Sequence, residues 1–309
     1  MSKHKSPYRK RQVRKISGVL VFLVSFSLFV LIFTGICLWM FVQMGEQGRA
    51  RNSSDDSSEF VTNFTDSDVR NLLVGIFDDD KAAGFVMVRS DPAREAMWTL
   101  AFPPDTVVDN GTEEALICDL ARNGGMPAVR TALGELTGIH CEKYIALNYT
   151  GISGILNHFA YGLVYELDER VLIDNKPFNP GKSTFAATQV VSLLKYEDWN
   201  GGRRQRSMVQ SELLSSMINQ YLLPPRGGGT TSQNDDNKTF TAIINSAWQT
   251  DILISDYNSA KPGLEHLAAK NNGEICRVLQ VTGEYVGSGN LRFYPDENLR
   301  DTLKNTFSQ

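Results

Sequence analysis

Hydrophobic and polar positions divide the chain into an apolar run, a polar linker and a long segment of strand-like and helix-like patterns. From Ile16 to Met44 no residue is charged, and Val, Leu, Ile and Phe dominate. About 20 helical residues cross a hydrocarbon core of about 30 Å. We therefore expect residues 16–44 to form one transmembrane helix that spans with some tilt.

Charges flanking this run predict its orientation. The residues before it include seven Lys and Arg and no acidic residue, whereas Glu46, Asp55, Asp56 and Glu59 follow it. An excess of positive charge keeps a flank cytoplasmic. A cleaved signal peptide fits less well, because its apolar core runs about 7–15 residues and ends in small residues. We expect a cytoplasmic tail at 1–15 and a single-pass protein of the cell membrane whose C-terminal domain is extracellular.

Residues 45–66 are polar without helical or strand period, which predicts a stalk. The domain at 67–309 opens with short, continuous apolar runs, which are typical of strands buried on both faces. The predicted strands are Asn71–Phe77, Gly84–Val88, Glu95–Phe102, Lys143–Leu147 and Ile275–Val281.

Helical patterns alternate with these strands. This alternation predicts an α/β domain with a mixed central sheet and helices on both faces, preceded by the transmembrane helix. Pro224 and Pro225 end one long amphipathic helix and begin a polar loop at 224–238. The predicted helices are Glu113–Arg122, Met126–Leu136, Ile152–Phe159, Thr184–Lys195, Arg203–Leu222, Phe240–Leu253, Pro262–Lys270 and Asp296–Phe307.

Charge and cysteine content narrow the classes of function. The formal net charge is -4, and the first 45 residues carry +7, which leaves -11 for the remainder. A nucleic-acid-binding surface needs a net basic face, so we expect no nucleic-acid partner. Outside the apolar run lie Cys118, Cys141 and Cys276, an odd number that allows at most one intrachain disulfide, and the pairing stays open.

Common catalytic motifs are missing: the sequence has no GxSxG, HExxH, Walker A loop or GxGxxG after a strand. Asp78, Asp79 and Asp80 follow a predicted strand and form either a Mg²⁺ site or a solvated turn. His140 and His158 stand alone in the sequence, as does His266, and isolated histidines are more often structural than ligands.

The segment from Gly201 to Arg206 (GGRRQR) is the sharpest candidate. Glycines free the backbone before a helix, and helix N-termini attract anions. Arg203 and Arg206 are three residues apart and share one helix face. Two guanidinium groups there suit a phosphate or pyrophosphate. A surface patch paired with Glu197 or Asp198 explains the segment equally well.

The order of these segments resembles the LytR–CpsA–Psr proteins of Gram-positive bacteria, over roughly residues 67–309. The opening strand (NLLVG), the PPDT segment at 103–106 and the Gly124-Gly125 helix occur in the family's order. They are followed by the strand KYIALN, the segment NGGRRQR at 200–206 and the closing FYPDE at 293–297.

This resemblance implies a function in the cell envelope. Such proteins transfer a phosphoglycopolymer from a polyprenyl-pyrophosphate carrier to peptidoglycan, with Mg²⁺ and arginines stabilising the leaving phosphate. The resemblance implies catalytic roles for Arg203 and Arg206, substrate binding by Lys195 and Arg204, and metal binding by Asp105. Its expected partners are the membrane, a polyprenyl-linked glycopolymer and peptidoglycan.

Departures from the family pattern predict weakened chemistry. The family's serine-aspartate-threonine falls at about residues 82–84 (Ala-Ala-Gly), so one metal ligand is missing. Pro104 replaces an arginine, Glu197 inverts a charge, and Asn200 replaces an aspartate. Losing one preorganised donor costs about 3–4 kcal/mol of transition-state stabilisation. We expect a weak or non-catalytic binder, unless Asp78–Asp80 and Arg70 or Arg89 compensate.

Two alternatives stay open. The first is an active glycopolymer ligase with rearranged metal and arginine ligands. The second is a Golgi-type glycosyltransferase of the same membrane topology, whose glycans would occupy Asn-x-Ser/Thr sites such as the one at Asn63. The sequence has no clear Asp-x-Asp motif at a strand end beyond Asp78–Asp80, which disfavours this second alternative.

Overall fold

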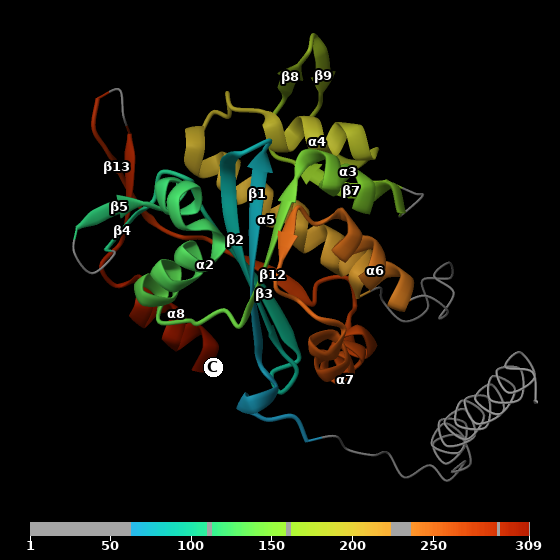
Figure 1. The fold of residues 1–309 in the computed structure, drawn as a ribbon. Coiled ribbons are helices and arrows are strands. Elements are labelled where there is room, and N and C mark those ends of the chain that lie inside the picture. Colours follow the sequence, from blue (N-terminus) through green and yellow to red (C-terminus); the bar gives the residue numbers. More distant parts are fainter. Residues whose placement is uncertain (1–62, 110–112, 159–161, 224–235, 289–290, 309) are drawn as a thin grey trace, which may run out of the picture. The chain divides into compact units, whose positions relative to one another are not determined.

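The computed structural model describes residues 63–109, 113–158, 162–223, 236–288 and 291–308. Residues Asn63–Gln309 form one compact unit (Figure 1). The predicted cytoplasmic tail at 1–15, the transmembrane helix at 16–44 and most of the stalk lie outside the described residues. Within the described ranges, no helix combines the length and apolar character needed to cross a membrane.

A six-stranded mixed sheet forms the centre of this unit, in the order β11-β6-β1-β2-β3-β12. β2 is antiparallel to both β1 and β3, whereas β6 is parallel to β1 and β12 is parallel to β3. β1, β3, β6 and β12 therefore run in one direction and end together at what we call the carboxyl end of the sheet. The strands are β1 (Arg70–Asp78), β2 (Lys81–Asp91), β3 (Ala96–Phe102), β6 (Lys143–Asn148), β11 (Gln249–Thr250) and β12 (Cys276–Leu279).

The apolar runs of the sequence are buried on both faces, as predicted. β3 is buried along its whole length, and β1 is buried over residues 73–77. Successive side chains of a strand point to opposite faces. Leu73 and Phe77 consequently enter one core, and Val74 and Ile76 enter a second core on the other face. Only a sheet covered on both sides makes such unbroken apolar strands favourable.

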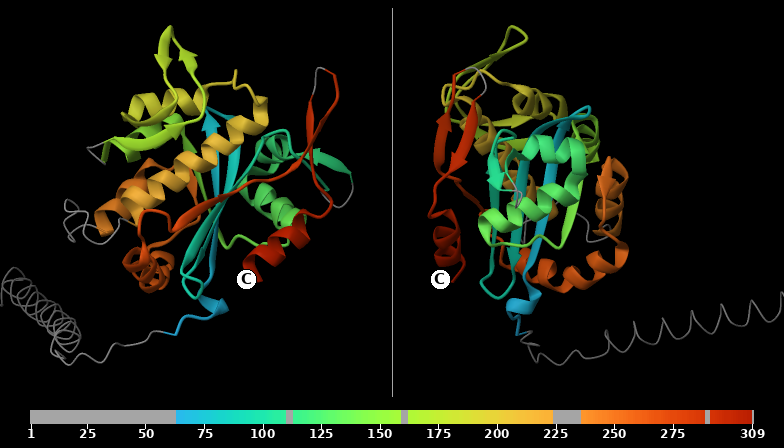
Figure 2. Two further views of the ribbon diagram at one scale, coloured as in Figure 1. Left: turned by 180° about the vertical axis from the view of Figure 1, so that it is seen from behind. Right: turned by 60° about the vertical axis from the view of Figure 1, so that its left-hand side comes forward.

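Helices cover both faces, which confirms the predicted class (Figure 2). One face carries α2 (Ile117–Thr137) and α8 (Leu299–Ser308). The other face carries α3 (Tyr149–His158), α4 (Ala187–Lys195), α5 (Gly202–Met217), α6 (Asp236–Ser246) and α7 (Ile254–Lys270).

The two helices predicted at 113–122 and 126–136 are the two parts of α2, which meet at a kink, and the first part starts later than expected. Gly125 breaks the helical backbone (φ 68°, ψ -170°), and Pro127 lies in the turn that follows. Gly138 ends α2 in the left-handed conformation (φ 73°). The first residues of the predicted helix instead form β5 (Glu114–Leu116), which pairs with β4 (Val107–Asp109).

Two further helix predictions were partly wrong because strand pairing overrides local helical pattern. Gly181–Phe185 forms β10, which pairs with β7 (Leu163–Leu167), so α4 begins only at Ala187. The helix predicted at Phe240–Leu253 ends at Ser246. The following residues form β11, which pairs with β6 and covers the edge of the sheet.

Short hairpins escaped the sequence prediction. β8 (Val171–Ile173) pairs with β9 (Lys176–Phe178), and β13 (Gly283–Val286) pairs with β14 (Arg292–Pro295). Asp174 and Asn175 both have positive φ (51° and 60°), as a two-residue hairpin turn of the primed type requires. The Asp-Asn pair was therefore a usable signal for this turn.

All three described cysteines are free thiols. Burial raises the pKa of Cys141 and of Cys276 to about 12. Because the thiolate is the reactive form, these two residues are chemically inert parts of the core.

Candidate functional site

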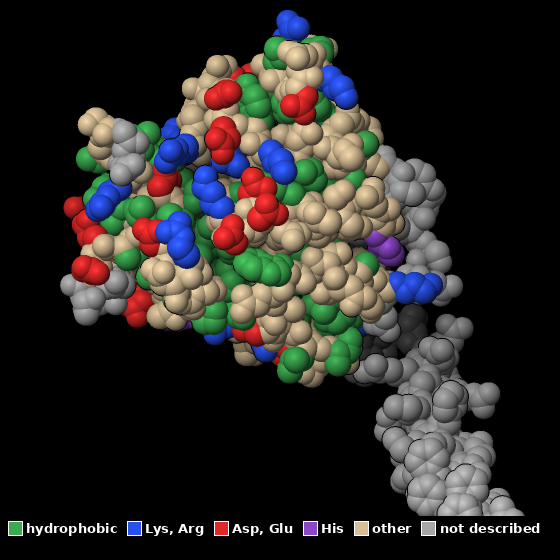
Figure 3. All heavy atoms as spheres, turned by 45° about the horizontal axis from the view of Figure 1, so that its top comes forward, with side chains coloured by type: hydrophobic (Ala, Val, Ile, Leu, Met, Phe, Trp, Pro, Cys, Tyr) green, Lys and Arg blue, Asp and Glu red, His purple; other side chains and the backbone are tan. Residues whose placement is uncertain are grey.

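The predicted site residues gather at the carboxyl end of the sheet. β1 ends at Asp78, Asp105 follows β3, and Tyr149 follows β6 at the start of α3. In open α/β sheets, ligands bind outside the carboxyl ends of the strands. Figure 3 turns this end toward the reader and shows Lys and Arg side chains interspersed with Asp and Glu. The face therefore offers cations without forming an unbroken positive patch.

The glycine–arginine segment starts α5 at this same end. Gly202 has a left-handed backbone (φ 63°), which lets the chain turn into the helix. The backbone N–H of Gly201 donates to Oε1 of Gln205 at 2.6 Å, so the helix supplies its own cap for this amide. The i, i+3 spacing predicted one shared helix face for Arg203 and Arg206, and in the structure the two side chains reach different partners.

Arg203 contacts a buried carboxylate. Its Nη1 lies 2.6 Å from Oδ2 of Asp105, whose side chain is 8% exposed. The hydroxyl of Tyr285 donates to Oδ1 of Asp105 at 3.4 Å. The hydrogen bond that Arg203 donates to Asp105 raises the pKa of Arg203, while burial and the Asp105 charge raise the pKa of Tyr285. We call Arg203, Asp105 and Tyr285 the Asp105 cluster.

Arg206 and Lys195 meet on a different residue, Tyr149, which is 5% exposed. Nη2 of Arg206 donates to the Tyr149 hydroxyl at 3.3 Å, and Nζ of Lys195 lies 4.7 Å from the centroid of the Tyr149 ring. The carbonyl of Leu194, in the last turn of α4, accepts from Nε of Arg206 and from the Tyr149 hydroxyl, each at 3.4 Å. We call Tyr149, Lys195 and Arg206 the Tyr149 cluster.

The two cations of the Tyr149 cluster also have carboxylate partners. Nη1 of Arg206 lies 2.8 Å from Oε1 of Glu197, and Nζ of Lys195 lies 3.5 Å from Oδ1 of Asp78. The Glu197 and Asp78 side chains are 71% and 55% exposed. The Lys195–Asp78 pair is exposed on both sides and contributes about 0–1 kcal/mol, whereas the Arg206 side chain of the other pair is only 15% exposed.

Among the described residues Arg204 makes no ion pair with either cluster, although its charge opposes the rise in the pKa of Tyr285. Arg204 lines a small pocket between α5, β3 and β12, together with Pro103, Ser207, Ser211 and residues 278–281. Ser211 is fully buried, and its hydroxyl has no hydrogen-bond partner. Among the cations predicted for the site, Arg204 is the one for which no carboxylate partner occurs in the described residues.

Magnesium does not fit the residues as they are arranged. Both carboxylate oxygens of Asp105 are engaged, one by Arg203 and one by Tyr285. Asp79 and Asp80 form the turn between β1 and β2, and Asp78 pairs with Lys195. Across the described ranges, no group of three or more His, Cys, Asp or Glu side chains could hold a metal ion. Magnesium therefore stays a prediction drawn from the resemblance.

The segment at residues 82–84, where the resemblance places the missing aspartate, is closed by α5. Nε2 of Gln210 donates to the Ala83 carbonyl at 3.1 Å, and its Oε1 is buried without a partner. A Cβ added to Gly84 would lie 1.9 Å from that Oε1. A side chain at position 84 would therefore require the Gln210 amide to move.

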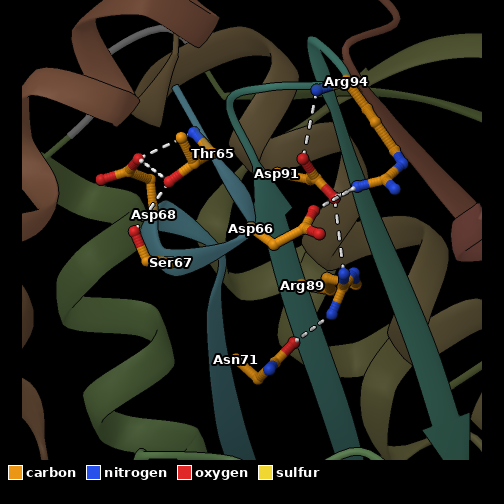
Figure 4. Close-up of polar contacts among 8 residues, drawn as sticks. All are labelled: Thr65, Asp66, Ser67, Asp68, Asn71, Arg89, Asp91 and Arg94. Carbon is orange, nitrogen blue, oxygen red and sulfur yellow. Dashed lines mark hydrogen bonds and ion pairs between the residues drawn. The ribbon is translucent and has the colours of Figure 1, made fainter. Parts of the chain in front are cut away.

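Arg70 and Arg89 cannot compensate for missing site charges, because they lie at the opposite end of the sheet. They sit at the start of β1 and near the end of β2, where Arg70 is opposite Ser90. There Arg89 joins a separate network with Asp91, which also binds Arg94 (Figure 4).

The sequence did not single out Tyr149, Tyr285 or Gln210. Tyr149 and Tyr285 lie outside the predicted strands and helices, and Gln210 lies within the predicted helix Arg203–Leu222. Tyr149 follows directly after a predicted strand, and that position was the available signal. No local pattern marked Tyr285, which lies 180 residues from Asp105.

Solved structures share this fold, and three illustrate it. A proposed transcription regulator from Eubacterium siraeum is 18% identical, with a TM-score of 0.69, and the match covers 80% of this chain and 94% of that one. TagV of B. subtilis is 16% identical over 78% and 96% of the two chains, with a TM-score of 0.65. TagT bound to LIIa-WTA is 14% identical over 80% and 93%, with a TM-score of 0.63.

TagT, TagU and TagV are LytR–CpsA–Psr proteins, so the fold that the sequence resemblance implied is confirmed. No family model matches the chain, and no curated protein matches it. At these identities the likeness establishes the fold, and the roles of individual residues stay predictions.

Proposed function

We propose that this chain is a cell-envelope protein that binds the phosphate-bearing end of a polyprenyl-linked glycopolymer, with weak or no transferase activity. One observation carries this proposal. Lys195, Arg203 and Arg206 converge at the carboxyl end of a sheet whose fold is shared with TagT bound to LIIa-WTA. Such an end is where open α/β sheets bind ligands.

The charge balance of the site supports binding over catalysis. Each of these three cations contacts a carboxylate of the same site, namely Asp78, Asp105 or Glu197. Phosphoryl transfer depends on uncompensated positive charge where the leaving phosphate develops its own charge. Three paired cations stabilise that charge less than three free ones would, so we expect slow chemistry or none.

Location completes the proposal. A transmembrane helix at 16–44 would hold the domain at the outer face of the cell membrane, where a polyprenyl-linked substrate presents its pyrophosphate. The stalk at 45–66 would then set the reach toward peptidoglycan. Protease treatment of intact cells tests this topology: we expect loss of the C-terminal domain and protection of residues 1–15.

The decisive experiment uses the full-length chain with a polyprenyl-pyrophosphate-linked glycopolymer analogue, Mg²⁺ and peptidoglycan. We expect saturable binding of the analogue and little transfer to peptidoglycan. Robust transfer would contradict the non-catalytic assignment, and absence of binding would contradict the proposal as a whole. An analogue without the pyrophosphate is the matched ligand control.

A second candidate, the active ligase with rearranged ligands, is favoured by the direct contact between Arg203 and Asp105 at the same end of the sheet. It predicts that Arg203→Ala and Asp105→Ala each abolish attachment of polymer to the wall. Urea unfolding of both variants separates lost activity from lost folding. Normal attachment by both variants would exclude this candidate.

A further inference from the structure

Tyr149 holds both cations of its cluster at once. Its hydroxyl accepts from Nη2 of Arg206 at 3.3 Å, and its ring lies beneath Nζ of Lys195 at 4.7 Å. The same hydroxyl donates to the Leu194 carbonyl, which also accepts from Nε of Arg206. Arg206, Tyr149 and Leu194 therefore form a closed triangle of hydrogen bonds, and Nζ of Lys195 lies over the Tyr149 ring.

The chain order explains why this triangle forms. Leu194 lies in the last turn of α4, where helix carbonyls lack partners within the helix. Positive side chains near a helix C-terminus are favoured by the helix dipole. Arg206 comes from the first turn of α5 and Tyr149 from the start of α3, so three helix ends meet at one point.

The tyrosine hydroxyl stays protonated in this setting. Burial raises the pKa of Tyr149 above its ordinary value, although Arg206 acts in the opposite direction. A neutral hydroxyl can accept from Arg206 while donating to Leu194, which an ionised phenolate could not do. The contact therefore orients the guanidinium without neutralising its charge.

Exposure of the partner carboxylates decides where an anion can enter. A phosphate that binds Arg206 or Lys195 must displace Glu197 or Asp78, which are mostly exposed and recover their hydration when released. Arg203 is 53% exposed and contacts Asp105 through Nη1 alone, and a phosphate that binds this Nη1 must displace Asp105, whose side chain is 8% exposed. An uncompensated buried carboxylate is costly, so the Asp105 cluster resists opening.

We infer that Tyr149 is a positioning residue for an anion site in which Lys195 and Arg206 bind a phosphate or diphosphate group by displacing Asp78 and Glu197. This inference rests on the proposed function and on the roles that the resemblance implies for Lys195 and Arg206, and it adds Tyr149 as the residue that positions both side chains. In it, Tyr149 holds the two cations one beside the other before the ligand arrives. Such preorganisation lowers the entropy cost of binding, because two long side chains are already ordered before the ligand binds.

The experiment is calorimetric titration of the full-length chain with inorganic pyrophosphate, comparing Tyr149→Phe and Tyr149→Leu with the wild type. Tyr149→Phe keeps the ring under Lys195 and loses both hydroxyl hydrogen bonds, and we expect about fivefold weaker binding. Tyr149→Leu also loses the ring contact, and we expect about 15-fold weaker binding. The control Tyr294→Phe removes a hydroxyl that contacts the exposed Glu114, and it should bind as the wild type does.

A thermodynamic cycle with Lys195→Met separates positioning from a general structural effect. We expect Lys195→Met to weaken pyrophosphate binding several-fold in the wild type and much less in the Tyr149→Leu background, because the pair acts together. Lys182→Met, a charge change on the exposed β10, should leave binding unchanged. Circular dichroism and urea unfolding establish that each variant is folded.

Each outcome supports or overturns the inference. If both Tyr149 variants bind pyrophosphate with the same affinity as the wild type, the inference is overturned. Strictly additive effects of Lys195→Met and Tyr149→Leu would also overturn it. Binding of the lipid-linked analogue without binding of pyrophosphate would overturn the anion site and leave the proposed function standing. Binding of neither ligand would overturn both.

Discussion

The Asp105 cluster and the Tyr149 cluster begin on the same helical turn and differ in which partner of the ion pair is buried. The Arg203 side chain is 53% exposed and the Arg206 side chain is 15% exposed. Arg203 pairs with a carboxylate whose side chain is 8% exposed, and Arg206 pairs with one that is 71% exposed. The same type of ion pair is therefore costly to break in one cluster and easily exchanged in the other. By residue type and helix spacing, the two arginines had the same expected role. In the structure they differ in how deeply the carboxylate partner is buried.

The largest effect expected from this comparison is on stability. Arg203→Ala leaves Asp105 buried with only the Tyr285 hydroxyl, and we expect a loss of about 3 kcal/mol in the free energy of unfolding. Urea denaturation followed by circular dichroism measures it. Adding Asp105→Asn removes the uncompensated charge and should restore much of the loss. A change below about 1 kcal/mol for Arg203→Ala would show that the pair is as replaceable as a surface pair.

A second prediction tests the close contact between Gln210 on α5 and Gly84 on β2. Gly84→Ala places a Cβ where Gln210 now lies, and overpacking of this kind costs about 1–3 kcal/mol. Unfolding of the single variant measures it. The double variant Gly84→Ala, Gln210→Ala reopens the space and should be more stable than Gly84→Ala alone. If the double variant is no more stable, the close contact is not the cause.

A third test uses Glu212, which is also on α5 but contacts the Tyr165 hydroxyl (2.5 Å) instead of a cation. Burial raises the pKa of Glu212. Its stabilising contribution is therefore complete below the unfolded pKa and is lost as the pH rises through the folded pKa. We expect the stability of the wild type, relative to Glu212→Gln, to fall as the pH rises from about 4 toward neutrality. Parallel pH profiles of unfolding free energy would contradict this.

The smallest stability effect is expected in the Tyr149 cluster. Glu197→Gln removes an exposed partner of Arg206, and we expect the free energy of unfolding to change by less than about 0.5 kcal/mol. The same variant should bind pyrophosphate about two- to threefold more tightly, because one competing negative charge is gone. If Glu197→Gln lowers the free energy of unfolding and leaves the affinity for pyrophosphate unchanged, Glu197 is not the exchangeable partner that this comparison requires.

Much of the fold was predictable from local pattern. The apolar runs that became β1, β2 and β3 are long, continuous and free of Pro, so burial on both faces was the one favourable arrangement for them. The helix predictions at 184–186 and 247–253 were wrong, because Thr184 and Phe185 pair with β7 and residues 249–250 pair with β6. A local pattern carries no information about such partners.

The candidate site was predictable in its cations and not in their partners. Arg203, Arg206, Lys195 and Asp105 were expected, and the structure brings them to the same end of the sheet. Glu197 had been one candidate partner for the arginines, and the structure assigns it to Arg206 alone. Tyr149 approaches Arg206 from 57 residues away, a contact that needs three helix ends to meet.

The amino-acid sequence alone determined the apolar run at 16–44 with its charge asymmetry, the alternation of strands and helices, and the glycine–arginine segment that opens α5. These features depend on neighbours within a few residues, where hydrophobic period and helix spacing act directly. Only the tertiary structure decided which carboxylate each cation meets and how deeply that carboxylate is buried. Burial sets the cost of separating two charges, and it arises from packing between segments that are distant in the chain. The distinction between a fixed Arg203 and an exchangeable Arg206 therefore belongs to the fold.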